Sequence, residues 1–550
     1  MNETCFNING QLVDIFRKEI YPVSILVKEG SIAAIERVAE APEVYIMPGF
    51  IDAHVHIESS LLVPTEFARM AVVHGTVGTV SDPHEIANVC GMEGVRYMIE
   101  NGKKVNFKFY FGAPSCVPAT IFETAGGSIG LEDMETLLQD PDINYLAEMM
   151  NWPGVLSHDQ QVMEKIALAK RYGKPIDGHA PGLRGENAAK YAQVGISTDH
   201  ECMSYAEALE KLQLGMKIAI REGSAAKNFE ALIDLIDIEG NAENLMFCSD
   251  DKHPDSLLDG HINTLVARAV AKGKNIFDVL RVACLNPIYH YGMNVGTLQL
   301  NDPADFILVK DLAHFQVLQT YIGGELVASD GKSLIFSAKN STINKFLIPE
   351  VTADSFRIQG NSGKVRIIEV NDGQLVTTEG EAYMNAEEGE LVADASRDIL
   401  KIAVINRYES RPAALGFIKN FGIKKGAIAS SVAHDSHNVI VVGADDEAMK
   451  VAANAVISSQ GGLSAFDGHE TSLLPLPVAG LMTIADGFEV AKSYIELDNF
   501  SKTMGATLAS PYMTLSFMAL LVIPSLKISD LGLFDGEKFE FVALHKSDGA

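Results

Sequence analysis

The sequence predicts an α/β protein built around a (β/α)8 TIM-type barrel, with a small flanking β-sandwich domain and a C-terminal α+β domain. Three observations predict this fold. Short apolar runs alternate with helix-compatible stretches over residues 49–287, and β-rich segments lie on both sides of that region. The chain has 550 residues, which exceeds what one hydrophobic core usually holds, so several domains are expected.

The two flanking segments carry the strand and turn signals of a small β-sandwich. Residues 1–48 contain VSILVKEGSIAAIERV, which reads as two strands around a turn at Gly30. Residues 288–345 contain GTLQLNDPADFILVK and TYIGGELVASDGK, with a further turn at Gly323-Gly324. We therefore expect both ends of the central region to contribute to one β domain.

Eight short apolar or β-branched runs predict the barrel strands. They cover residues 49–57, 76–83, 107–114, 143–150, 174–180, 195–200, 216–224 and 244–251. Helix-compatible stretches such as PTEFARMAVVHG and DQQVMEKIALAKRYG separate most of them. In this fold the catalytic groups lie at the C-terminal ends of the strands, so the polar residues that end these runs are candidates for the site.

Residues 346–550 are expected to form the α+β domain, with strands at 401–408 and 436–445. The longest apolar run, Met513–Ile523, is too short to cross a membrane and is expected to be a buried helix. The N-terminal residues lack the features of a signal peptide, and no membrane partner is expected.

Charge and cysteine usage narrow the functional classes. The chain has 44 basic and 72 acidic residues, a net charge of −28, so it lacks the cationic surface that a nucleic-acid partner requires. Its six cysteines are scattered without a C-x-x-C pair, which argues against a disulfide framework or a zinc knuckle. The pattern fits a reducing compartment, and we expect a cytoplasmic protein.

Two histidines end the first expected barrel strand, in GFIDAHVHIESS. On a strand, His54 and His56 point to the same face about 6.5–7 Å apart, close enough to bind one metal ion. Histidines held by hydrogen bonds inside the fold are the alternative interpretation. Asp52 shares their parity one step deeper, and we expect it to orient a ligand.

Four further candidate ligands end other strands of the expected barrel. Glu148 ends the fourth strand, His179 the fifth, His200 the sixth and Asp250 the eighth. A carboxylate at a strand end is often a helix cap, but five such strand ends at one face of a barrel are hard to explain by caps alone. The sequence therefore predicts a metal site at the barrel mouth.

PGFIDAHVHIESS, followed in order by a Glu, two His and an Asp, resembles the amidohydrolase superfamily of metal-dependent hydrolases. More narrowly, SDPHEIANVCG, GHAPGL, TDHE, CSDDKHP and SVAHDSHN resemble the adenine deaminase family, over nearly the whole chain. The resemblance implies hydrolysis of adenine to hypoxanthine and ammonia, in purine salvage and adenine catabolism. It also leads us to expect a homo-oligomer, a dimer.

The resemblance further implies a binuclear centre. His54, His56 and Asp250 would hold the first ion, His179 and His200 the second, and Glu148 would bridge them. The resemblance implies manganese, with iron and zinc as alternatives, and the ligand set is compatible because mixed carboxylate and imidazole sites accept several divalent ions. The glutamate stands where many relatives use a carboxylated lysine.

The expected reaction is attack of a metal-activated hydroxide on C6 of adenine. Asp250 would take the proton and later pass it to the departing ammonia. Ring nitrogen N1 needs a proton or a strong hydrogen bond, which a buried carboxylic acid of raised pKa could supply. The candidate acids are Glu58 and Glu85, ranked first, and Glu201 and Glu222; caps and surface pairs explain an isolated glutamate equally well.

Further residues at strand ends are expected to bind substrate, namely Asp251, Glu201, Arg221 and His84. Asp251 could instead support a metal-bound histidine, and a structural role explains His84 and Arg221 equally well. The AHDSHN segment, with His434, Asp435, His437 and Asn438, could close over the barrel mouth, hold another ion or pack as a polar loop.

Two other functions stay open at this point. One is a cyclic amidase of the dihydroorotase or hydantoinase type, against which the glutamate at position 148 and the long C-terminal region argue. The other is a non-catalytic barrel, against which the intact set of six ligand positions argues.

Overall fold

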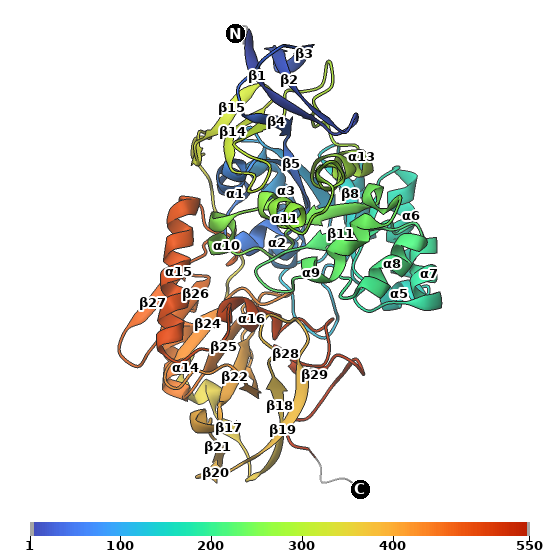
Figure 1. The fold of residues 1–550 in the computed structure, drawn as a ribbon. Helices are drawn as coiled ribbons and strands as arrows, with labels where there is room; N and C mark the ends of the chain where they lie inside the picture. The colour runs from blue at the N-terminus through green and yellow to red at the C-terminus, as the bar shows by residue number, and fades with distance from the viewer. Residues whose placement is uncertain (1–4, 547–550) are drawn as a thin grey trace.

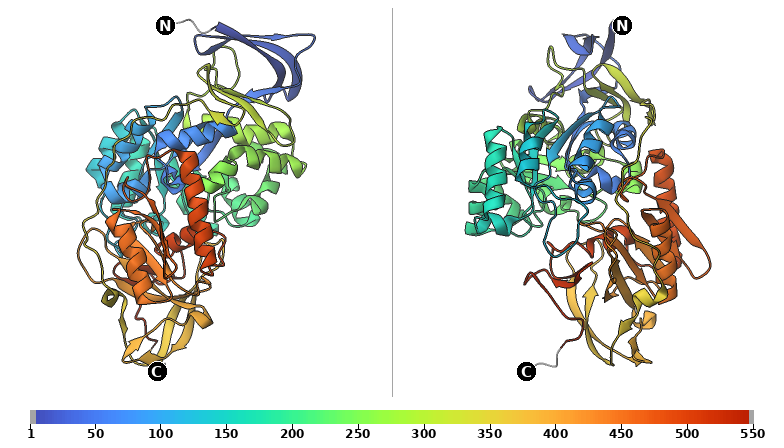
Figure 2. Two further views of the ribbon diagram at one scale, coloured as in Figure 1. Left: turned by 90° about the vertical axis from the view of Figure 1, so that its left-hand side faces the viewer. Right: turned by 180° about the vertical axis from the view of Figure 1, so that it is seen from behind.

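A barrel stands between two β-rich parts of the chain in the computed structural model, which describes residues 5–546 (Figure 1). The N-terminal sheet lies at one end, the barrel in the middle and the C-terminal domain at the other end, and this order is visible from two further sides (Figure 2). The mouth of the barrel therefore faces another domain.

All eight expected barrel strands form, which confirms the (β/α)8 prediction. Their bounds are β5 Phe50–Val55, β6 Thr76–Ser81, β7 Lys108–Ala113, β8 Ile143–Met149, β9 Ile176–Gly178, β10 Thr198–Asp199, β11 Lys217–Arg221 and β12 Leu245–Cys248. Strands β5–β9 form one parallel sheet and β10–β12 another. Two links close the ring: Ser197 N–H donates to the Ile176 carbonyl at 2.8 Å, and Val55 pairs with Asp250.

Helices alternate with these strands, as the sequence pattern predicts. The longer ones are α1 Pro64–Ala71, α2 His84–Cys90, α3 Met92–Gly102, α4 Leu131–Gln139, α6 Gln160–Arg171, α7 Gly185–Gln193, α8 Tyr205–Gln213 and α11 Ile262–Ala271. Helix α6 shows why they form: the Asp159 side chain caps its first turn by accepting from Val162 N–H, and Ile166 and Ala169 bury one face.

The N-terminal β region is one continuous sheet of eight strands, and it combines both flanking segments. The strands are β1 Cys5–Asp14, β2 Glu19–Lys28, β3 Ser31–Arg37, β4 Tyr45–Pro48, β13 Phe306–Val309, β14 Val317–Ile322, β15 Glu325–Ser329 and β16 Lys332–Ser333. β4 joins the segments because it pairs with β1 on one side and with β13 on the other. Ile25 and Phe306 share one core. The proposed domain bounds, 1–48 with 288–345, 49–287 and 346–550, stay a prediction.

The C-terminal region is built on a second eight-stranded sheet. Its strands are β18 Gly363–Glu369, β19 Thr378–Met384, β22 Ile399–Ile405, β23 Ala414–Lys419, β24 Ala427–Ser430, β25 Val439–Gly443, β26 Gly462–Phe466 and β27 Thr471–Pro475. The expected strands at 401–408 and 436–445 correspond to β22 and β25. Helix α14 Asp446–Ser458 packs on this sheet, and a small three-stranded sheet, β28 Leu526–Ser529, β29 Gly532–Asp535 and β30 Glu540–Phe541, follows near the end.

The expected helix over Met513–Ile523 is only partly right. Helix α16, Pro511–Phe517, ends in the middle of the apolar run, and the following residues form turns. The run is buried almost throughout, so burial was predicted correctly and the length of the helix was not. Among residues 5–546, no helix is long and apolar enough to span a membrane.

The C-terminal domain is joined to the barrel along several segments. Helix α15, Gly487–Thr503, runs beside α1 and beside α10, Pro254–Asp259 (Figure 1). Thr483 N–H donates to the Leu61 carbonyl at 2.8 Å, so the backbones of the two parts are hydrogen-bonded directly. These contacts hold the C-terminal domain over the strand ends.

Candidate metal centre

The six predicted ligands lie together at the C-terminal ends of the barrel strands. Each is buried, with between 2 and 8% of its surface exposed. They come from five different strands or the residues that directly follow them: His54, His56, Glu148, His179, His200 and Asp250. Residues with this chemistry, gathered out of contact with bulk water, are the kind of donor set that divalent metals bind.

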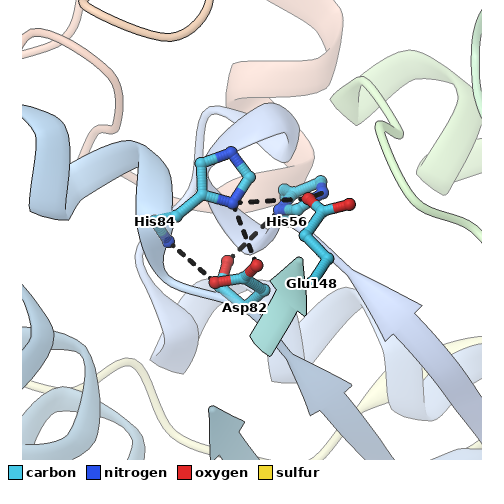
Figure 3. Close-up of side chains that lie close together, drawn as sticks. All are labelled: His56, Asp82, His84 and Glu148. Carbon is cyan, nitrogen blue, oxygen red and sulfur yellow. Dashed lines mark hydrogen bonds and ion pairs between the residues drawn. The ribbon is translucent and has the colours of Figure 1, made fainter. Parts of the chain in front are cut away.

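Glu148 lies at the centre of this group, and its two carboxylate oxygens face different histidines. Oε1 is 3.3 Å from His56 Nε2. Oε2 is 2.7 Å from His179 Nδ1 and 3.1 Å from His200 Nε2. Figure 3 shows the Glu148 carboxylate turned toward His56. The carboxylate therefore stands between two sets of imidazoles.

Local backbone packing fixes where His179 points. Gly178 precedes it on β9, and a Cβ at this glycine would lie 2.4 Å from the Thr198 carbonyl oxygen on β10. Any larger residue would force the two strands apart, so only glycine allows this approach. The close approach of β9 and β10 brings His179 and His200 to the same side of Glu148.

Asp250 approaches the same group from the end of β12. Its Oδ1 lies 3.2 Å from His56 Nε2 and 3.7 Å from His54 Nε2. The residue has a φ of 54°, a left-handed conformation that aspartate tolerates better than most residues. Its N–H donates to the His54 carbonyl at 2.9 Å, so β5 holds this less common conformation in place.

The geometry of the imidazoles fits bound cations. His54 Nε2 and His56 Nε2 face each other at 3.2 Å, and two lone pairs at that distance repel unless a proton or a metal lies by them. Within residues 5–546, His54 Nδ1 and His179 Nε2 are buried without a hydrogen-bond partner. Burial, and then His200, hold the pKa of His54 well below its usual value and favour its neutral ring. For His56, burial is outweighed by the Asp250 and Glu148 carboxylates, which raise the pKa of this ring.

Arg221 at the end of β11 connects two acids of the site. Its Nη1 contacts both Glu201 Oε1 and Asp250 Oδ2, and its Nη2 donates to Glu201 Oε2 at 3.1 Å. All three side chains are buried. One oxygen of Asp250 is therefore held by a guanidinium, and the other faces the histidines. Arg221 and Glu201 line the cavity described below, and their predicted contact with substrate stays a prediction.

The four candidate acids for N1 occupy different places. Glu85 and Glu201 line the cavity, whereas Glu58 and Glu222 do not. Glu58 is buried beside α2, where its Oε1 accepts from Ile86 N–H at 3.2 Å, and burial raises its pKa to about 7. Glu222 pairs with Arg268 at 2.7 Å, on the outer side of the barrel.

His84 belongs to a cluster that sequence reasoning described only in part. Its Nδ1 lies 3.0 Å from Asp82 Oδ2 and 3.5 Å from Glu148 Oε1, and its ring stands beside that of His56 (Figure 3). Asp82 was not among the predicted residues. Its position after β6, in SDPHE, was the available signal, because the candidate ligands were sought at such strand ends.

Two further acids near the site, Asp251 and Asp52, make hydrogen bonds to neighbouring polar groups. Asp251 lines the cavity and accepts a 2.5 Å hydrogen bond from Ser59 Oγ. Asp52 accepts from Ser249 N–H at 3.0 Å and lies 2.8 Å from His261 Nε2. Ser249 directly precedes Asp250, so Asp52 contacts the backbone next to a candidate ligand, and its orienting role stays a prediction.

A small cavity of about 30 Å³ lies over the centre, between the barrel and the C-terminal domain. The barrel side is lined by the histidines and acids named above and by Met150. We define the roof as the lining residues of the C-terminal domain, Leu375, His434, Asp435, Phe517 and Leu520. Closing over the mouth was one of three alternatives that the sequence left open for the AHDSHN segment, and His434 and Asp435 of this segment line the cavity. The three apolar roof residues were not predicted.

Comparisons with known proteins cover both parts of this cavity. The amidohydrolase family matches residues 45–327, and the adenine deaminase C-terminal domain matches residues 374–540. The adenine deaminase of Salinibacter ruber is 53% identical over 98% of this chain and 98% of its own length. Those of a Sulfurovum species and of Methanosarcina barkeri are 54% and 50% identical, each over 97% of this chain and over 99% and 98% of their own lengths.

Proposed function

The chain belongs to the adenine deaminase family of the amidohydrolases, and on this premise we propose that its barrel-mouth centre hydrolyses adenine to hypoxanthine and ammonia. We place this reaction in purine salvage and adenine catabolism. The observation that carries the proposal is the position of Glu148, whose two oxygens face two different histidine sets. A bridging carboxylate of this kind suits a binuclear hydrolytic centre.

The ligand assignment follows the contacts around Glu148. His54, His56 and Asp250 would hold one ion, His179 and His200 the other, and Glu148 both. When bound, divalent ions polarise water and supply a nucleophile at neutral pH. We propose manganese, with iron and zinc as alternatives, because imidazole and carboxylate ligands suit all three.

Asp250 is proposed as the residue that moves protons. Burial raises the pKa of its carboxyl, but the Arg221 guanidinium outweighs this effect and, with His56, holds the pKa well below its usual range. The residue is therefore ionised before reaction and can accept the proton of the attacking water. It can then donate that proton to the amino group that leaves as ammonia.

The two acids ranked first for N1 differ in access to substrate. Glu85 lines the cavity, whereas Glu58 lies beside α2 and hydrogen-bonds to backbone there. Access therefore favours Glu85 over Glu58. However, both carboxylate oxygens of Glu85 already contact histidines, His434 and His437, so Glu85 would have to give up one of these contacts to reach the purine directly.

An assay of both products tests the proposal. The metal-free protein should release neither hypoxanthine nor ammonia from adenine, and loading with manganese should restore both in equal amounts. A fully loaded protein that releases no ammonia from adenine would overturn it. Opening of a cyclic amide such as dihydroorotate would instead support the amidase, and fewer than one bound ion per chain would support the non-catalytic barrel.

We also propose a cytoplasmic, dimeric enzyme. All six cysteines are free, and five of them are buried, which supports a reducing compartment. Light scattering on the loaded protein tests the dimer: a mass near the 59.4 kDa of one chain would contradict it.

A further inference from the structure

The C-terminal domain brings one titratable ring to the cavity, that of His434. The residue is buried and lines the cavity, and its ring packs against Phe517 with the ring centroids 5.2 Å apart. Its Nδ1 lies 2.5 Å from Glu85 Oε1, on the barrel side. A second histidine, His437, contacts the other oxygen of Glu85 through Nε2.

Glu85, His434 and His437 could be taken for an additional metal site, since their donor atoms lie close together. The hydrogen bonding of His437 argues against that interpretation. Ala433 N–H donates to His437 Nδ1 at 3.2 Å, so this nitrogen carries the lone pair. In the neutral ring Nε2 then carries the proton and donates to Glu85, whereas a metal ligand needs a lone pair there.

Burial keeps His437 neutral, because it holds the pKa of this imidazole near 4 despite the neighbouring Glu85 carboxylate. Glu85 is therefore a carboxylate that accepts hydrogen bonds from two histidines. His437 fixes one oxygen of Glu85, and the other oxygen receives the Nδ1–H of His434. With Nδ1 occupied in this way, Nε2 is the nitrogen of His434 left for another partner.

We propose that His434, oriented by Glu85, is a catalytic residue that contacts the purine, donating a hydrogen bond from Nε2 to an acceptor nitrogen of the ring. This inference rests on the proposed function. A carboxylate that holds one imidazole nitrogen while the other faces the reactant is a recurring way to position a histidine. Burial lowers the pKa of His434, but Glu85 outweighs it and raises that pKa to about 9, so the ring can donate from both nitrogens at neutral pH.

The proposal changes the role of Glu85. Instead of giving its own proton to the purine, Glu85 stays ionised and holds the imidazolium that faces the substrate. The hydrogen bond from a charged donor would stabilise the negative charge that forms on the ring as C6 is attacked. The C-terminal domain then contributes to the chemistry as well as to the enclosure of the cavity.

Binding measurements that combine His434 variants with purine analogues test whether His434 contacts the purine. Purine and its 1-, 3- and 7-deaza analogues, each lacking one acceptor nitrogen, are measured by calorimetry on the manganese-loaded wild type and on His434→Phe. In the wild type, one analogue should bind about tenfold to a hundredfold more weakly than purine, as expected for loss of a hydrogen bond to a charged group. In His434→Phe, that analogue and purine should bind alike.

Two further variants serve as controls. His437→Phe removes the other partner of Glu85 without changing a cavity-lining residue, and it should keep the discrimination between analogues while lowering thermal stability. If His434→Phe does not fold, His434→Gln replaces it; its neutral amide donor should retain only part of the discrimination.

Unchanged discrimination in a folded His434 variant would overturn the proposal. Loss of bound metal from either histidine variant would also overturn it, because it would make the cluster a metal site. A wild-type protein that does not deaminate adenine refutes the proposed function instead, and the binding measurements separate these two failures.

Discussion

The two sides of the cavity are made in different ways. The barrel side consists of charged and titratable groups at the ends of successive strands, such as Glu148 and Asp250. The roof is mainly apolar, with Leu375, Phe517 and Leu520. A rigid set of strand ends positions reacting groups, while an apolar cover keeps water out and strengthens the electrostatic interactions beneath it.

Each side also contains a buried cation, and these two cations differ in their partners. Arg221 below the centre contacts two carboxylates, Glu201 and Asp250. Lys527 behind the roof donates to two backbone carbonyls, those of Leu375 and Phe517, at 2.6 and 2.9 Å. Arg221 therefore has carboxylate partners that keep it charged, whereas Lys527 on the roof side can become neutral by losing its proton.

The largest effect is expected on the barrel side, for Glu148→Ala. Removing the carboxylate that faces both histidine sets should release bound metal and lower kcat/KM by at least about a hundredfold, because even residues that only orient ligands contribute tenfold to a hundredfold. Metal analysis and ammonia release measure it. Glu222→Ala, an acid on the outer side of the barrel, is the matched control and should change neither quantity.

Arg221→Met should have the next largest effect. It removes the guanidinium that Glu201 and Asp250 share, which should destabilise the fold by about 3–5 kcal/mol and lower kcat/KM about tenfold to a hundredfold. Adding Glu201→Gln removes one of the two carboxylate charges and should recover part of the stability. A double variant no more stable than Arg221→Met would contradict the role of Arg221 as the shared partner of these two acids.

Lys527→Met tests whether the buried lysine behind the roof makes the stability of the protein depend on pH. Burial lowers the pKa of Lys527 to about 7, whereas the unfolded chain keeps it near about 10.4. Between these values the unfolded state binds more protons, so the lysine's destabilising effect is full below about pH 7 and disappears as the pH rises toward about 10.4. Wild-type stability should thus gain up to about 1.4 kcal/mol per pH unit from this residue.

Denaturant unfolding at pH 7 and pH 9 measures this slope. The Met variant should lack the gain, whatever its absolute stability, because its side chain cannot titrate. Equal pH dependence in both proteins would mean that Lys527 stays charged in the folded protein.

The smallest effect is expected for Tyr494→Phe, which removes a contact between the domains outside the cavity. The Tyr494 hydroxyl lies 2.6 Å from His253 Nδ1, and neither residue lines the cavity. Loss of this buried hydrogen bond should lower the free energy of unfolding by about 1–2 kcal/mol and leave KM for adenine unchanged. A raised KM would show that this contact also shapes the roof.

Much of the barrel side could be predicted from the sequence, because its residues follow a repeated local rule. Each candidate ligand lies at or near the end of an apolar run, and parallel strands bring their ends to one face, so position along the chain predicts position in space. His54 and His200 lie far apart in sequence, yet their rings stack with centroids 3.9 Å apart. Asp82 follows β6 directly and obeys the same rule, although it was not among the predicted residues.

The roof could not be predicted in the same way. Leu375 lies between β18 and β19, and Phe517 ends α16, so the residues come from separate segments that share no pattern. In the sequence they look like ordinary core residues. The partnership of Glu85 with His434 and His437 was also hidden, because it joins positions about 350 residues apart through tertiary packing alone.

The small size of the cavity has a consequence for the turnover rate of the enzyme. A cavity of about 30 Å³ has room for about one water molecule, which is less than a purine base occupies. Because the cavity is lined by strand-end residues and by the roof, binding a base requires some of these lining side chains or segments to shift. Where such a shift is slower than the chemical step, the shift and not the chemistry limits turnover.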